Sequence, residues 1–207
     1  MEEFDRKEHW ENIYENKALH EVSWFQPKPE TSIQIIQDLG LKKNAKIIDI
    51  GGGDSLLVDN LLELGFEDIT VLDISAKALE RLKTRLGENA RKIHWIVADI
   101  GKVKLVEKFD FWHDRAAFHF LSEKKEIENY LKNATNCLSS KGYLTVGTFS
   151  TNGPKKCSGI EIKQYSETSL TSCFQTVFKP LHCFTIDHET PFKTHQNFIF
   201  CSFRKIK

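Results

Sequence analysis

The sequence lacks several features that would assign a protein to a function class at once. Its 207 residues carry 29 lysines and arginines against 29 aspartates and glutamates, so the formal net charge is zero. A chain without excess positive charge has no strong general attraction for nucleic acid or for an anionic membrane. No apolar run is long enough to span a bilayer, and the charged beginning, MEEFDRKEHWENIYENK, lacks the apolar core of a signal peptide. We therefore expect a cytoplasmic protein with neither a nucleic-acid nor a membrane partner.

Cysteines are few and widely spaced. The five are Cys137, Cys157, Cys173, Cys183 and Cys201. An odd number with no C-x-x-C pair predicts neither a disulfide framework nor a thiolate zinc site. No H-x-x-x-H spacing is present either, so no metal site is expected. Most of these cysteines are interpreted as small buried apolar residues, whereas Cys157 lies among turn-forming residues.

The centre of the chain alternates between short apolar runs and amphipathic stretches, and no repeat, low-complexity tract or linker interrupts it. Strands are expected at 45–51, 68–75, 92–100, 109–118 and 142–149, and helices at 55–66, 76–87 and 123–142. Strands that alternate with helices of this length predict an α/β fold with a doubly wound, mostly parallel sheet. Residues 1–207 are therefore interpreted as a single domain.

The two ends of the chain depart from this alternation. Helices are expected at 4–17 and 29–39, and strands at 181–190 and 196–205. The two late strands, joined by PFKTH, suit an antiparallel C-terminal hairpin at the edge of the sheet. The domain is thus expected to comprise a helical lid (1–40), a core (41–150), and a loop followed by the hairpin (151–207).

Three consecutive glycines, Gly51, Gly52 and Gly53, follow the first expected strand in the sequence KIIDIGGGDS. Consecutive glycines cost backbone entropy and bury no side chain, so the backbone must turn sharply or approach another group closely. In a doubly wound fold, the connection between the first strand and the first helix is where a nucleotide-like ligand binds. The alternative is a tight connection that serves no ligand.

Aspartates accompany the ends of the first three expected strands. Asp73 closes the second strand 22 residues after Gly51, where a carboxylate can accept hydrogen bonds from both hydroxyls of a ribose. Asp99, at the end of the third strand, could address an adenine amino group. Asp49 beside the glycines would repel a pyrophosphate, and Leu56 replaces the third glycine of the dinucleotide fingerprint. A ligand with a positive centre, such as S-adenosylmethionine, is therefore favoured over a dinucleotide.

The motifs DIGGGDS, VLDIS, VADI and HDRAAFHFL, in this order, resemble those of the class I S-adenosylmethionine-dependent methyltransferases. The resemblance extends from about Trp10 to the last expected strand. It implies an enzyme whose cofactor is S-adenosylmethionine and whose product is S-adenosylhomocysteine. Many members have a third glycine where Ser55 stands, which is tolerated if Ser55 caps the following helix.

The resemblance also implies which residues bind the cofactor. Asp49, Gly51 and Gly53 would surround its methionine moiety, Asp73 its ribose, and Asp99 with Ile100 its adenine, while Gly52, Ile74 and His113 complete the set. The opening helix and SWFQPKPE match the family's lid, so Trp10, Tyr14, Trp24 and Gln26 are expected to close over the ligand. Without the resemblance, Trp10 and Tyr14 would be interpreted as core residues.

The methyl acceptor is expected beside the end of the fourth strand, FWHDRAAFHF. Candidate catalytic residues there are His113, Asp114 and Arg115, and candidate substrate-binding residues are Phe118, His119, Cys157 and His188. Histidines are natural bases near neutral pH, although a lone histidine is more often a structural hydrogen-bonding group. The Asp-Arg pair resembles the thiopurine and small-thiol branch of the family, and the Asn/Asp-Pro-Pro-Tyr signature of amine-directed branches is absent. A small-molecule acceptor with a sulfur or other soft nucleophile is therefore favoured.

Two alternatives remain open from the sequence. The stretches GFEDITVLDIS and HDRAAFHFL also resemble the protein-lysine methyltransferases that modify translation elongation factors, which would make a protein the substrate. The other alternative is a non-catalytic module that binds S-adenosylmethionine without turning it over. The acceptor and any catalytic base are not identified by the residues.

Overall fold

The computed structural model describes residues 4–206 and has an α/β architecture. Its helices are α1 (Arg6–Asn16), α2 (Glu30–Asp38), α3 (Leu57–Glu63), α4 (Ala76–Leu86), α5 (Lys124–Cys137) and α6 (Glu167–Phe174). Its strands are β1 (Lys46–Ile50), β2 (Asp68–Asp73), β3 (Ile93–Val97), β4 (Phe109–Arg115), β5 (Leu138–Phe149), β6 (Lys156–Cys157), β7 (Ile160–Glu161), β8 (Phe178–Glu189) and β9 (His195–Lys205). Short 3₁₀ turns occur at Leu19–Glu21, Gly87–Lys92 and Phe118–Phe120.

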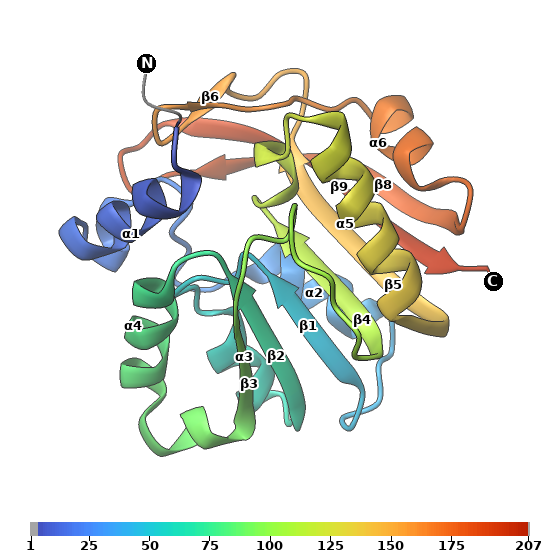
Figure 1. Cartoon of the computed structure of the whole chain (residues 1–207), viewed down its shortest axis with the longest axis horizontal. Coiled ribbons are helices and arrows are strands. Elements are labelled where there is room, and N and C mark those ends of the chain that lie inside the picture. The colour runs from blue at the N-terminus through green and yellow to red at the C-terminus, as the bar shows by residue number, and fades with distance from the viewer. Residues whose placement is uncertain (1–3, 207) are drawn as a thin grey trace.

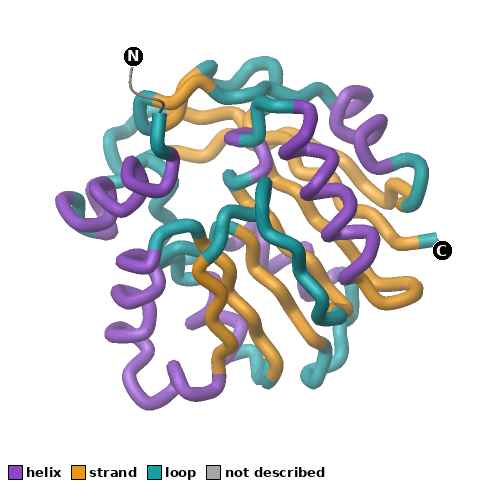
Figure 2. The backbone as a smooth tube through the Cα atoms, viewed as in Figure 1, coloured by secondary structure: helices purple, strands orange, loops and turns teal. Residues whose placement is uncertain are grey.

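A seven-stranded sheet in the order β3-β2-β1-β4-β5-β9-β8 forms the centre of the molecule, with helices on both faces (Figure 2). The strands β1 to β5 are parallel, whereas β9 runs antiparallel to β5 and β8 antiparallel to β9. The predicted doubly wound sheet with a C-terminal antiparallel hairpin is therefore confirmed. The strand order reverses between β1 and β4, which is the point where such sheets open a crevice for ligands.

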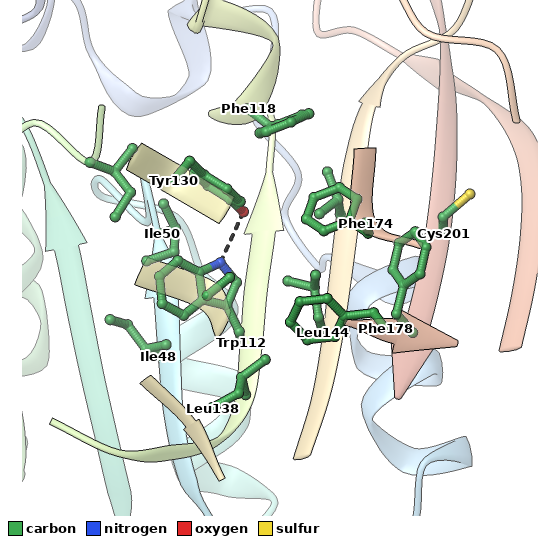
Figure 3. Packing of buried hydrophobic residues seen from close by; sticks show 14 of the residues in the cluster. Ile48, Ile50, Trp112, Phe118, Tyr130, Leu138, Leu144, Phe174, Phe178 and Cys201 are labelled. Atoms are coloured by element: carbon green, nitrogen blue, oxygen red, sulfur yellow. Dashed lines mark hydrogen bonds between the residues drawn. The ribbon is translucent and has the colours of Figure 1, made fainter. Parts of the chain in front are cut away.

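Neighbouring residues of β4 enter the two separate cores of the sheet. Trp112 packs under α5 and α6, and its indole Nε1 donates a hydrogen bond of 2.9 Å to the hydroxyl of Tyr130 (Figure 3). Phe111 faces the other side, among residues of α2, α3 and α4. Both faces of a parallel sheet are thus buried, which explains the nearly continuous apolar runs in the strands. Within residues 4–206, no helix has the length and apolarity needed to cross a membrane.

Helix α1 lies next to the start of α4 (Figure 1) and is held there by Glu11 in its middle and Arg6 at its N-terminal end. The carboxylate of Glu11 accepts hydrogen bonds from the Ser75 hydroxyl (2.7 Å) and from the amides of Ala76 and Lys77 (2.9 and 3.0 Å). These amides begin α4, where free N–H groups and the helix dipole favour a negative charge. Arg6 forms an ion pair of 2.8 Å with Glu126 at the start of α5. The lid is therefore part of the folded domain.

Several predicted boundaries are wrong: the strand predicted at 109–118 ends at Arg115, the strand predicted at 181–190 begins at Phe178, and the largest difference is at the end of α5. The helix predicted at 123–142 ends at Cys137, and β5 begins at Leu138 instead of Gly142. Leu138 is buried and pairs with Phe109 of β4. The strand therefore begins at Leu138 because of core packing, although the sequence there has no strong helix-stop signal. The loop expected after β5 contains α6 and the short β6–β7 hairpin, and a capping interaction between Ser166 and Ser169 begins α6.

The prediction of no disulfide framework is also wrong for one pair of cysteines. Cys183 of β8 and Cys201 of β9 are bonded, and their Cα atoms lie 4.2 Å apart. The hairpin register places these two residues directly opposite each other. Sequence spacing cannot reveal such a pair, because it depends on which residues of two strands are aligned. Cys137, Cys157 and Cys173 are free thiols.

Candidate functional site

Two adjoining pockets lie at the carboxyl ends of the parallel strands. The first encloses about 780 Å³ and the second about 540 Å³, counting the space at their mouths. Both volumes are typical of pockets that bind small molecules. Four residues line both pockets and mark where they meet: Tyr14, Trp24, Gly51 and Arg115.

One half of the first pocket, formed by residues after β2 and β3, is here named the nucleotide half. Its lining residues are Arg6, Asp73, Ile74, Ala98, Asp99 and Ile100. The Oδ1 atom of Asp73 accepts a hydrogen bond of 2.8 Å from the amide of Ser75, and Oδ1 of Asp99 accepts one of 2.8 Å from Gly101. The structure thus brings together at one edge of the sheet the two carboxylates that the sequence suggested for ribose and adenine.

The carboxyl group of Asp73 titrates far from its usual range. Asp73 is 5% exposed, and this burial, opposed by hydrogen bonds from the Ser75 and Gly53 amides, raises its pKa to about 7. The nearby carboxylates of Asp54 and Asp49 raise the pKa further. A carboxyl group in a pocket with a pKa near neutral pH is a candidate ligand-binding group. Hydrogen-bond donors of a bound ligand would favour its ionised form.

Close approach and backbone conformation explain the consecutive glycines. Gly51 has a φ of +64°, and a Cβ there would lie 2.6 Å from the Cβ of Ala117. A Cβ on Gly52 would lie 2.7 Å from both Oδ2 of Asp49 and Cγ1 of Val71. Side chains essentially never tolerate such distances, so these positions require glycine. Gly53 in turn leaves room for the hydroxyl of Tyr14 from the lid.

The second pocket has a buried polar wall of three residues that hydrogen-bond in a row. The Nδ1 atom of His113 lies 2.7 Å from Oδ1 of Asp49, and its Nε2 lies 2.9 Å from the hydroxyl of Ser32. All three side chains are at most 2% exposed. Because a carboxylate can only accept, Nδ1 of His113 donates to Asp49, while Nε2 shares a hydrogen bond with the Ser32 hydroxyl. His113 thus joins α2 to the residue that supports the glycine turn, and Gln26 lines the same pocket.

The other half of the first pocket is here named the aromatic chamber. It is formed by residues of β4, β5, β6 and β9 and of the turn after β4: Arg115, Phe120, Phe149, Cys157, Gln196 and Phe198. Trp10 and Trp24 of the lid cover it and stack edge-to-face, with ring centroids 5.6 Å apart. Because β4 lies between β1 and β5, the chamber and the nucleotide half occupy opposite sides of Gly51.

Cys157 lies in this chamber on the β6–β7 hairpin, as the sequence suggested. Burial raises the pKa of its thiol to about 11, although a hydrogen bond with Ser158 and the charge of Arg115 oppose the shift. The thiol is therefore protonated at neutral pH and is a poor nucleophile there. In the chamber, Cys157 serves as a small, weakly polar lining residue.

Several candidate residues from the sequence lie outside both pockets. Asp114 accepts hydrogen bonds from the amides of Ala117 and Phe118 and from the Tyr130 hydroxyl, so its geometry fits a structural role rather than catalysis. Phe118 belongs to the core under α5. The 3₁₀ turn at Phe118–Phe120 directs the Phe118 side chain away from both pockets, whereas Phe120 lines the first one.

The two remaining candidate histidines also lie behind the pocket wall. His119 is fully buried and stacks on Phe149, with ring centroids 4.5 Å apart. Burial and the charge of Arg115 lower its pKa to about 3. His188 donates a hydrogen bond of 2.8 Å from Nε2 to the carbonyl of Ser23 and so supports the lid segment. Neither histidine lines a pocket in the structure.

Sequence reasoning missed several residues of the site. Ser32 lies in a helix that carries no recognisable motif, and Gln196 and Phe198 lie on a strand more than 140 residues beyond the glycines. The one available signal was the polar Gln196 and Asn197 at the start of an otherwise apolar strand. Within residues 4–206, no group of three or more histidine, cysteine or acidic side chains is placed to hold a metal ion.

Comparison with known proteins agrees with this geometry. A family model described as "Methyltransferase domain" matches residues 48–144, which include β1, the glycines, β2 to β4 and the start of β5. The chain is 27% identical over 158 residues to a ubiquinone biosynthesis O-methyltransferase of Pelagibacter ubique, covering 72% of this chain and 63% of that protein. It is 24% identical over 104 residues to the mouse eEF1A lysine and N-terminal methyltransferase, covering 49% of this chain and 14% of that protein. The chain therefore spans less than two thirds of the length of these curated relatives.

Solved structures share the whole fold. The N-methyltransferase NodS from Bradyrhizobium japonicum, in complex with S-adenosylhomocysteine, superposes with a TM-score of 0.72 at 17% identity, covering 98% of this chain and 100% of that one. A methyltransferase from Anabaena variabilis gives a TM-score of 0.74 at 15% identity, covering 98% and 96% of the two chains. At such identities the likeness concerns the fold.

The sheet order, the glycine turn and the acidic strand ends define a class I methyltransferase domain. Together with the family model that matches residues 48–144, they make the chain similar to the class I S-adenosylmethionine-dependent methyltransferases. The residues present fit S-adenosylmethionine, the cofactor of that family. Asp73 offers a buried carboxylate whose Oδ2 has no side-chain partner among the described residues, Asp99 offers a second carboxylate, and Gly51 lines the same pocket.

Proposed function

We propose that the protein transfers the methyl group of S-adenosylmethionine to a small-molecule acceptor, with a thiol or another soft nucleophile favoured. Bound S-adenosylmethionine would supply an electrophilic methyl group on a sulfonium centre. The observation that carries the proposal is the aromatic chamber, which continues from the nucleotide half past Gly51 and is covered by Trp10 and Trp24. A closed apolar chamber beside a cofactor pocket orients a small reactant and excludes water from it.

Each part of the pocket has a proposed role. Asp73 binds the ribose hydroxyls, and Asp99 with Ile100 binds the adenine. The second pocket, with Asp49, His113 and Gln26 in its wall, receives the amino-acid end of the cofactor. Trp10 and Tyr14 close over it from α1. Arg115 and Cys157 face the acceptor in the chamber.

A protein-lysine acceptor is the second candidate, because the mouse relative is an eEF1A lysine and N-terminal methyltransferase. The chamber disfavours it. A lysine side chain would have to carry its amine past the lid to a wall that contains the guanidinium of Arg115, and an amine gains positive charge when it is methylated. Like charges in a buried site repel strongly.

The proposal is tested by binding first and by turnover second. Calorimetry with S-adenosylmethionine and S-adenosylhomocysteine should show saturable binding of both, and a labelled-methyl assay should then show transfer to low-molecular-weight thiols. Label appearing only in a protein of a cell extract would support the lysine alternative instead. Binding of both compounds without transfer to any acceptor would support a non-catalytic module.

The affinity for S-adenosylhomocysteine is expected to rise with pH. The raised pKa of Asp73, about 7, means that the free protein favours the protonated carboxyl group. Ribose hydroxyls donate best to the ionised form, so binding must release a proton below this pKa. Affinity should increase about tenfold between pH 6 and pH 8 and level off above the pKa. Calorimetry across this range measures it, and the Asp73→Asn variant should show a flat profile; an unchanged slope in that variant would contradict the assignment.

A further inference from the structure

Arg115 is a half-buried cation whose charge has no acidic partner in contact with it among the described residues. Its Nη1 donates a hydrogen bond of 3.1 Å to the carbonyl of Trp24, whereas Nη2 is shielded from solvent and has no hydrogen-bond partner among residues 4–206. No ion pair within 4.0 Å joins Arg115 to a carboxylate of the described residues. An arginine presents five donors, so one unused nitrogen in a pocket wall is a site for an acceptor from outside the chain.

The guanidinium points toward the aromatic chamber. Its central carbon lies 5.1 Å from the ring centroid of Phe198 on β9, which is two strands away from β4 in the sheet. Gln196 lies two residues before Phe198 on the same strand, hence on the same face. The side-chain oxygen of Gln196 is also buried without a partner within the described residues. Two unused polar atoms of opposite type therefore line one chamber.

The charge of Arg115 persists despite its surroundings. Burial lowers its pKa to about 10, partly offset by Asp49, so the group remains cationic at neutral pH. Asp49 does not neutralise it by contact, because its Oδ1 is engaged by His113 and its Oδ2 lies against Gly52. The chamber itself has only aromatic walls, Gln196 and the neutral thiol of Cys157. A buried cation without an acidic partner is costly, and a bound anion would offset that cost.

We propose that Arg115 and Gln196 bind the methyl acceptor as a small monoanion, with the negative atom at Nη2 of Arg115 and a neighbouring N–H or O–H donating to the Gln196 oxygen. The acceptor class is a thiolate or another soft anion whose apolar body lies among Phe120, Phe149 and Phe198. The inference rests on the proposed function, because it specifies the acceptor of that reaction.

The chemistry of transfer balances without a base from the chain. The acceptor loses its proton to solvent before it binds. Its lone pair forms the new bond to the methyl carbon, and the carbon–sulfur bond breaks with its electron pair going to sulfur. A positive sulfonium and a negative acceptor become two neutral thioethers, and a water-excluded aromatic chamber favours a step in which opposite charges disappear.

The test separates acceptor binding from turnover. The probe is 4-nitrothiophenolate, titrated against the full chain in the presence of S-adenosylhomocysteine, with its visible absorption as the signal. Arg115→Met should weaken its binding about 30-fold, because a hydrogen bond to a charged group is lost from a buried site. The uncharged methyl thioether, 4-nitrothioanisole, should bind both proteins equally. Arg91→Met, at an exposed arginine, is the matched control.

A second variant keeps the test decisive if Arg115→Met folds poorly. Gln196→Leu conserves size and leaves Arg115 in place. It should weaken binding of 2-aminothiophenolate, whose amine can donate to the Gln196 oxygen, several-fold while leaving S-adenosylhomocysteine binding unchanged. Loss of S-adenosylhomocysteine affinity in Arg115→Met, equal to the loss for the anion, would assign Arg115 to the cofactor carboxylate and overturn the proposal. Failure of the wild-type chain to bind 4-nitrothiophenolate, iodide or thiocyanate would also overturn it.

The outcome is distinguishable from failure of the proposed function. Arginine-dependent binding of the anion without methyl transfer would leave the inference standing and remove the methyl-transfer activity. Methyl transfer to a thiol at an unchanged rate in Arg115→Met would support the proposed methyl-transfer activity and overturn the inference about Arg115.

Discussion

Replacing Asp73 with alanine is expected to weaken binding of S-adenosylmethionine about 100-fold. Asp73 ends β2, is 5% exposed, and uses Oδ1 to accept the amide of Ser75. In the proposed binding mode, its other oxygen accepts hydrogen bonds from the ribose. Hydrogen bonds to a charged group contribute about 1.5–3 kcal/mol each. We expect two hydrogen bonds between Asp73 and the ribose hydroxyls, one of them with imperfect geometry. Their loss should therefore weaken binding by about 3 kcal/mol.

Calorimetry of Asp73→Ala with S-adenosylmethionine and S-adenosylhomocysteine measures this loss directly. Asp68→Ala, at the opposite end of β2, removes an acidic side chain far from the pocket and should leave both affinities unchanged. The fold should survive the change, because burial makes the ionised Asp73 unfavourable in the free protein. Equal affinities in wild-type and Asp73→Ala protein would place the ribose elsewhere.

The central fold could be predicted because its signals are local. Each parallel strand is a short apolar run, and each helix between them has one apolar face, as in the pair β2 and α4. Gly65 and Gly87 follow α3 and α4 and end them with positive φ angles. These patterns need no knowledge of distant residues. The alternation of strands and helices along the chain could therefore be predicted from periodicity alone.

The missed features depend on contacts between distant segments. The start of β5 at Leu138 is decided by its pairing with Phe109, about thirty residues earlier. The Cys183–Cys201 bond follows from the register of the β8–β9 hairpin. Helix α6 offered a local signal, the serines Ser166 and Ser169 at its start, but its eight residues show little amphipathic periodicity.

The candidate site divides in the same way. The residues at the ends of β1, β2 and β3 could be predicted, because parallel strands bring their carboxyl ends to one edge. Their side chains Asp73, Ile74 and Asp99 all line the first pocket. For the residues that follow β4, the prediction of which side chains reach the pocket depended on the direction of the turn after that strand. The 3₁₀ turn at Phe118–Phe120 sends Phe120 into the pocket and buries Phe118 and His119 behind it, which no sequence pattern specified.

Replacing His113 with leucine is expected to lower the free energy of unfolding by about 3 kcal/mol. His113 donates to Asp49 and hydrogen-bonds to Ser32, and all three side chains are buried. Leucine fills similar space but leaves a buried carboxylate without its donor and a buried hydroxyl without its partner. For a chain of this size, a change of about 3 kcal/mol corresponds to a decrease in Tm of about 6–12 °C. Urea unfolding at pH 7 measures the free energy, and a thermal scan measures the Tm.

Two further variants separate the hydrogen-bond effect from simple loss of a histidine. In His113→Asn the amide can still donate to Asp49, so about half of the lost stability should return. His94→Leu changes an exposed histidine on β3 and should alter stability by no more than about 0.5 kcal/mol. A His113→Leu protein as stable as wild type would mean that water reaches Asp49. The second pocket would then be open to solvent, and the glycine turn would not depend on the row of hydrogen bonds from Ser32 to Asp49.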